Sequence, residues 1–88
     1  KKKNIKIKVN MLNIDDLRIE LITVANVVRE HVEVAEKANI SVPYLTQIRN
    51  GKNAKTDTEE NRTLLKNIIN IYREIGRRKE RDLQNVLS

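Results

Sequence analysis

The sequence contains no cysteine and only one histidine in 88 residues. Without cysteine the chain has no disulfide, no thiolate nucleophile and no thiolate metal ligand. One histidine cannot form a metal site alone, and the acids and histidine do not cluster as they do in catalytic sites. We therefore expect no metal, no cofactor and no small-molecule substrate, and we predict that the chain is not an enzyme.

Aromatic residues and long apolar runs are scarce as well. Tyr44 and Tyr72 are the only aromatic residues, so a core must consist of Ile, Leu, Val and Ala, which suit packed helices. No run approaches the ~20 apolar residues of a membrane span, and no signal-peptide pattern is present. We expect one small, soluble, cytoplasmic domain whose limited core favours association with a second copy.

Positive charge exceeds negative charge, with 18 basic and 12 acidic residues. The stretch 15–36 is acidic, whereas 37–56 contains no Asp or Glu and carries four bases. Further basic clusters lie in 1–8 and 77–81. Uncompensated positive charge attracts phosphate backbones through counterion release. The distribution indicates a nucleic-acid partner, although ordinary solvated faces have the same composition.

The spacing of apolar residues predicts mostly helices. Alternation over 5–10 is typical of a short strand, so 1–12 is either a strand or a basic arm. Apolar residues at helical spacing follow from Asn13, a suitable N-cap, and a second short helix ends near Asn39, which tolerates the left-handed conformation. Ser41 can cap a third helix, which Gly51 ends.

A long final helix is predicted after the start signal 57–60, where Asp57 or Thr58 can act as cap. Unbroken to Leu87 it would be ~44 Å long, so part of it should project or fold back. Its last apolar residues, Leu83, Val86 and Leu87, either dock on the core of their own chain or make a short dimer contact. We divide the chain into an arm or strand (1–12), a helical domain (13–76) and a charged helical extension (77–88).

The two short central helices have the spacing of a helix-turn-helix. This motif needs a small residue where the helices touch, a tolerant residue in the turn and apolar residues that hold the second helix. Ala35 and Asn39 fill the first two positions, and Leu45 and Ile48 fill the third. The sequence therefore predicts an all-α fold of four to five helices that contains a helix-turn-helix, with a short N-terminal strand as an option.

The segment Val32–Lys52, VEVAEKANISVPYLTQIRNGK, resembles the Xre/Cro family of helix-turn-helix DNA-binding domains, which includes the lambdoid phage repressors. Ala35, Leu45 and Ile48 occupy positions typical of the family, and 48–52 resembles the end of its recognition helix. The resemblance implies sequence-specific binding of double-stranded DNA through the helix Ser41–Asn50. It also implies a homodimeric transcriptional regulator of phage or mobile-element type.

Candidate DNA contacts follow from the chemistry of the outward residues and from the resemblance. Gln47 can bond bidentately with adenine, Arg49 can reach guanine or phosphate, and the apolar pair 42–43 can press on a thymine methyl group. The loop after the helix can meet phosphates, which position a protein without reading sequence. The predicted DNA-binding residues are Ser41, Val42, Pro43, Tyr44, Thr46, Gln47, Arg49, Asn50, Lys52, Asn53 and Lys55. His31 is expected to be a surface or boundary residue.

Two alternatives come from other classes of protein. The same fold can serve a structural or assembly protein that uses the helix-turn-helix for protein contacts. A ribbon-helix-helix-like protein would instead read DNA through 5–10. In that case Lys6→Ala would weaken DNA binding and Gln47→Ala would not.

Overall fold

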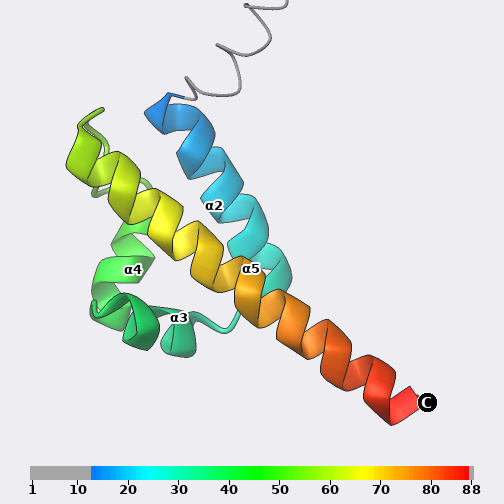
Figure 1. Cartoon of the computed structure of the whole chain (residues 1–88). Helices are drawn as coiled ribbons and strands as arrows, with labels where there is room; N and C mark the ends of the chain where they lie inside the picture. Colours follow the sequence, from blue (N-terminus) through cyan, green and yellow to red (C-terminus); the bar gives the residue numbers. More distant parts are fainter. Residues whose placement is uncertain (1–12, 88) are drawn as a thin grey trace, which may run out of the picture.

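The computed structural model describes residues 13–87 and places four α-helices in them (Figure 1). They are α2 (Ile14–Val28), α3 (His31–Ala38), α4 (Val42–Arg49) and α5 (Glu59–Leu87). No strand occurs within this range, which confirms the prediction of an all-α fold. The strand or arm predicted for 1–12, and with it the ribbon-like reading of 5–10, lies outside the described residues.

The start of α2 follows the sequence signal, but its end does not. The Asn13 side chain accepts a hydrogen bond from the Asp16 backbone N–H at 2.9 Å, as the predicted cap requires. The helix ends at Val28, and the next residue, Arg29, has φ 73° and an N–H that bonds to the Ala25 carbonyl. This left-handed conformation costs a non-glycine residue ~1 kcal/mol. Packing of Val28 into the core offsets this cost, and no local signal reveals it.

The link between α3 and α4 has the predicted chemistry. Asn39 is left-handed with φ 61°, and its N–H returns to the last turn of α3. The Ser41 hydroxyl accepts a hydrogen bond from the Tyr44 N–H at 3.1 Å, and Pro43 lies in the first turn of α4. Gly51, with φ 79°, follows the end of α4. Three residues, 39–41, thus connect two eight-residue helices.

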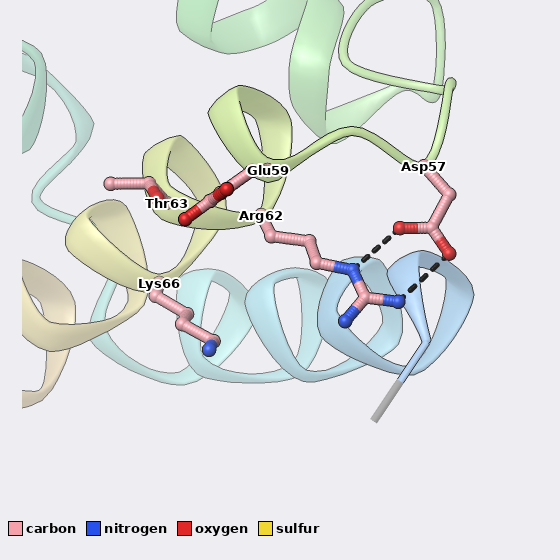
Figure 2. Close-up of a pocket in the computed structure, with 5 residues that line it drawn as sticks. All are labelled: Asp57, Glu59, Arg62, Thr63 and Lys66. Carbon is pink, nitrogen blue, oxygen red and sulfur yellow. Dashed lines mark hydrogen bonds and ion pairs between the residues drawn. The ribbon is translucent and has the colours of Figure 1, made fainter. Parts of the chain in front are cut away.

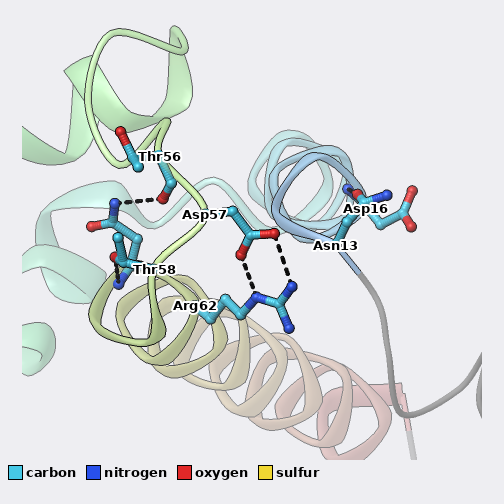
Figure 3. A network of polar contacts seen from close by, with 7 residues as sticks. Asn13, Asp16, Thr56, Asp57, Thr58 and Arg62 are labelled. Carbon is cyan, nitrogen blue, oxygen red and sulfur yellow. Dashed lines mark hydrogen bonds and ion pairs between the residues drawn. The ribbon is translucent and has the colours of Figure 1, made fainter.

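Polar contacts fix the start of α5 (Figure 3). The Thr58 hydroxyl accepts a hydrogen bond from the Asn61 N–H at 3.1 Å, so Thr58 and not Asp57 is the cap. Asp57 instead receives two bonds from Arg62, at 2.5 and 2.9 Å. The hydrogen bonds from Arg62 lower the pKa of the Asp57 carboxyl. This pair holds the loop after α4 against the first turn of α5.

α5 is the central helix of the fold. It runs unbroken through Gly76, and both α2 and α3 pack against it. The buried residues are all hydrophobic within the described part of the chain. They include Leu17, Leu21 and Ala25 from α2, Val34 and Ala35 from α3, Leu45 and Ile48 from α4, and Leu65, Ile68, Tyr72 and Ile75 from α5.

The end of α5 extends past the other helices (Figure 1). α2 ends where the Lys79 ammonium donates to the Val28 carbonyl at 3.3 Å. α5 continues for eight residues beyond Lys79, ~12 Å at 1.5 Å per residue. Leu83 and Val86 are 58% and 81% exposed there. The prediction that part of the helix projects is confirmed, and the alternative that Leu83 and Val86 dock on their own chain is wrong.

Candidate nucleic-acid interface

α4 presents a polar ridge on the side away from the core. Leu45 and Ile48 are buried, 0% and 2% exposed, and fix the inward side of the helix. Pro43, Gln47 and Asn50 follow at i, i+4 and i+7 and therefore share the opposite face. All three are exposed. This ridge is the part of α4 that a groove-shaped partner would meet first.

The two sides of the ridge differ in charge. Tyr44 lies on the side of α5, where it lines a shallow hollow with Glu59 and Glu60. Carboxylates at this position repel phosphates, so Tyr44 marks one edge of any DNA-binding face. Arg49 lies on the other side of α4 and is half-buried. Positive potential is thus displaced toward α3 and toward the loop after α4.

Arg49 lies near two side chains, His31 and Tyr72, whose contact was not predicted from the sequence. His31 Nδ1 and the Tyr72 hydroxyl are 2.7 Å apart, and the two rings meet edge to face with centroids 5.8 Å apart. The two groups share a hydrogen bond, and burial raises the pKa of the Tyr72 hydroxyl. His31 is half-buried at the start of α3, in agreement with its predicted boundary position. The pair joins α3 to α5, 41 residues later in the chain.

The same surroundings disfavour a charged His31. Burial, then the positive charges of Arg49 and Arg29, lower the pKa of His31 below its ordinary value. The folded state therefore binds this proton less readily than the unfolded chain, whose histidine titrates near ~6.5. The contribution of His31 to the free energy of unfolding is complete above pH ~6.5 and decreases as the pH falls below that value.

We expect His31→Gln to remove this pH dependence, because a glutamine amide can share a hydrogen bond with the Tyr72 hydroxyl without titrating. Urea unfolding at pH ~7.5 and ~5.5 measures the effect, in a window above the titration of the carboxylates. The wild type should lose more stability over this interval than the variant. An equal loss in both proteins would contradict the assignment of this pH dependence to His31.

The loop after α4 is hydrogen-bonded to Gln47, a residue of the ridge. The Asn53 side-chain amide donates to Gln47 Oε1, and the Lys52 N–H bonds to the Gln47 carbonyl at 2.8 Å. The amide N–H groups of Gln47 stay available to a base. A bidentate contact with adenine needs the carbonyl oxygen as well, so it requires the Asn53 bond to open. Lys52 and Lys55 are exposed.

Arg18, on α2, supports the turn at Gly51. A Cβ atom at Gly51 would overlap Arg18 Nη2, so the guanidinium packs directly on this glycine. Arg18 Nε is buried and has no hydrogen-bond partner within the described residues. The sequence indicated only that Gly51 ends the helix. The contact with Arg18 is a second reason why position 51 requires a glycine, besides its left-handed conformation.

Ion pairs are distributed unevenly over the surface. The structure describes five, and each joins residues of α2, α3 or α5, of the link between α2 and α3, or of the short segment before α5. They are Arg18–Asp15, Arg62–Asp57, Arg73–Glu20, Arg78–Glu33 and Lys79–Glu30. A polar hollow is lined by Glu59, Thr63 and Lys66 together with the Arg62–Asp57 pair. In it, the Arg62 guanidinium points to Asp57 (Figure 2). Within residues 13–87, Arg49, Lys52 and Lys55 have no such acidic partner.

The predicted site residues lie on one continuous stretch, from the start of α4 to the loop that follows it. Eight are exposed and three, Thr46, Arg49 and Asn53, are half-buried. The exposed ones are Ser41, Val42, Pro43, Tyr44, Gln47, Asn50, Lys52 and Lys55.

Neither a metal-binding cluster nor a membrane-spanning helix occurs in the described part of the chain. Residues 13–87 contain no group of three or more His, Asp or Glu side chains placed to hold a metal ion. Among the same residues, no helix has the length and apolarity needed to cross a membrane. No protein-family model, curated protein or solved structure matches the chain.

Proposed function

We propose that α3 and α4 form a helix-turn-helix and that the exposed face of α4 binds the major groove of double-stranded DNA. The two helices are short, their link of three residues has a left-handed Asn39, and Ala35 is buried beside it. These features match what the motif requires. The resemblance of Val32–Lys52 to the Xre/Cro family supports the same reading.

The observation that carries the proposal is a group of unpaired cations in a stretch, 37–56, that contains no Asp or Glu. Five basic residues of α2 and α5 have acidic partners, while Arg49, Lys52 and Lys55 have none among the described residues. These three lie beside the ridge of Pro43, Gln47 and Asn50. Phosphates can take the place that acids hold elsewhere on the surface.

The parts of the surface have different roles in the proposed complex. Lys52 and Lys55 contact phosphates and set the position of the protein. Gln47 reads a base edge with its amide, and Pro43 contacts a thymine methyl group. The carboxylates beside Tyr44 keep the backbone of the DNA away from the start of α5. The role that follows is a transcriptional regulator of phage or mobile-element type, without catalytic activity, acting as a homodimer on a two-fold site.

Selection of binding sites from a randomised DNA duplex tests the proposal. The wild type should enrich a common motif. Gln47→Ala should retain binding and lose ~1–3 kcal/mol of discrimination at one base position, because one base contact is removed. Glu74→Ala, on an exposed position of α5, is the matched control and should enrich the wild-type motif. Absence of any enriched motif would contradict sequence-specific binding and favour a surface for protein contacts.

A further inference from the structure

Two anchored neighbours fix the position of Asn53 in the loop after α4. Gly51 has φ 79° and is covered by the Arg18 guanidinium of α2. Ala54 has φ 58° and packs against the hydrophobic core. Between these two residues a backbone N–H of the loop bonds to the Gln47 carbonyl at 2.8 Å. The loop backbone therefore holds Asn53 beside Gln47, independently of the contact between their side chains.

The contact between the two side chains fixes the orientation of the Gln47 amide. The half-buried Asn53 donates from its side-chain nitrogen to Gln47 Oε1, while Gln47 itself is exposed on the ridge of α4. A glutamine amide has one accepting oxygen and two N–H donors, on opposite sides of its carbonyl carbon. Because the oxygen is directed to Asn53, the nitrogen is turned away from the loop. The folded protein thus presents Gln47 to a partner as a donor.

The four bases differ in what they offer to a group that only donates. In the major groove guanine presents two neighbouring acceptors, N7 and O6, and thymine presents one acceptor beside its methyl group. Adenine presents an acceptor next to an N–H donor, and cytosine presents a donor. A donating amide therefore forms the most hydrogen bonds with guanine. With adenine it loses the second bond, which needs the glutamine oxygen.

We propose that Asn53 determines base specificity, by holding Gln47 Oε1 so that Gln47 selects guanine and not adenine. The inference rests on the proposed DNA-binding function and names the base that this surface reads. It also replaces the adenine contact that the sequence alone suggested for Gln47. Asn53 acts through Gln47 and is a positioning residue in this role, whereas a direct contact of Asn53 with phosphate would leave the choice of base unchanged.

Selection of binding sites from a randomised duplex tests the proposal. The base pair read by Gln47 is the one whose preference is lost in Gln47→Ala, and the wild type should enrich guanine there. Asn53→Ala frees the glutamine oxygen, so adenine should replace guanine, with a change of about tenfold or more in the ratio of the two bases. Asn53→Asp can only accept, which turns the glutamine oxygen outward. Adenine or cytosine, which donate, should then replace guanine.

An asparagine outside the proposed surface provides matched controls for both substitutions. Asn70 is exposed on α5. Asn70→Ala removes an amide and Asn70→Asp adds a negative charge, as the two Asn53 variants do, and both should still enrich guanine. Adenine at this position in the wild type would overturn the proposal. So would guanine in both Asn53 variants with weaker binding of all sequences, the result expected of a phosphate contact alone.

A measurement without DNA separates this inference from the proposed function. In ¹⁵N spectra of the free protein, one proton of the Asn53 side-chain amide should be shifted downfield by its hydrogen bond, and Gln47→Ala should abolish that shift. The signals of Asn70 should stay the same in both proteins. Asn53 signals that are unchanged by Gln47→Ala would overturn the inference and leave DNA binding intact. A shift that Gln47→Ala abolishes, in a wild type that enriches no motif, would instead contradict the proposed function and with it the choice of base.

Discussion

Replacing Tyr72 with alanine should destabilise the protein by ~3–5 kcal/mol. Tyr72 is the only aromatic residue of the core and is fully buried, 0% exposed. Its removal leaves a cavity between α5 and α3, and it also removes the hydrogen bond to His31. A domain of this size has a total stability of only about 5–15 kcal/mol, so a considerable fraction should unfold at physiological temperature.

Urea unfolding followed by circular dichroism measures the loss. Tyr72→Phe keeps the packing and removes only the hydrogen bond, so it should cost ~1 kcal/mol. Tyr44→Ala is the matched control, because Tyr44 is 36% exposed and lies at the edge of α4. It should cost less than either change at Tyr72. A Tyr72→Ala protein as stable as the Tyr44→Ala protein would show that the core is not organised around Tyr72.

The largest functional effect is expected from Lys52→Ala combined with Lys55→Ala. Both lysines are exposed, and neither has an acidic partner in residues 13–87, so phosphates are their natural counterions. Loss of two phosphate contacts should weaken binding of a mixed-sequence duplex about ten- to hundredfold at low salt. The dependence of log K on log salt should become less steep by about 1.8, or ~0.9 for each contact.

Fluorescence anisotropy over a salt series gives both quantities. Lys66→Ala is the control, since Lys66 is an exposed lysine of α5 that lies with Asp57 and Glu59. It removes one charge without removing a predicted contact, so its slope should equal that of the wild type. Equal slopes for the double variant and the wild type would place the DNA elsewhere on the surface.

Local signals predicted the parts of the fold that depend on neighbours in sequence. Asn13 and Ser41 cap helices because their side-chain oxygens reach an N–H three residues on, and Asn39 and Gly51 take left-handed conformations that they tolerate. The long final helix followed from its apolar spacing and from its acidic start. These features need no information about distant residues.

Contacts between distant residues could not be predicted. The left-handed Arg29 is accepted because Val28 is held in the core, and nothing in the local sequence marks the end of α2 there. The bond from Tyr72 to His31 spans 41 positions, and the packing of Arg18 on Gly51 joins α2 to the loop after α4. A partner for a titratable or charged side chain is a tertiary property, which periodicity does not contain.

The candidate site was predicted as a stretch of sequence, and the structure adds its orientation. Helical spacing placed Leu45 and Ile48 inward, and both are buried. It did not show that Tyr44 borders the carboxylates of α5, or that Asn53 holds the Gln47 amide. Both come from the return of the chain through the loop after α4. They narrow the proposed contact surface to the ridge and its basic side.

The most direct test of the proposed DNA-binding face is a nuclear magnetic resonance titration of the ¹⁵N-labelled chain with a mixed-sequence duplex at low salt. We expect the largest amide shift changes in Ser41–Lys55, apart from Pro43, which has no amide proton. The amides of α2 and of the end of α5 should change little unless dimerisation accompanies binding. Changes confined to 5–10 would support the ribbon-like reading instead, and no change at any amide would contradict DNA binding by this protein.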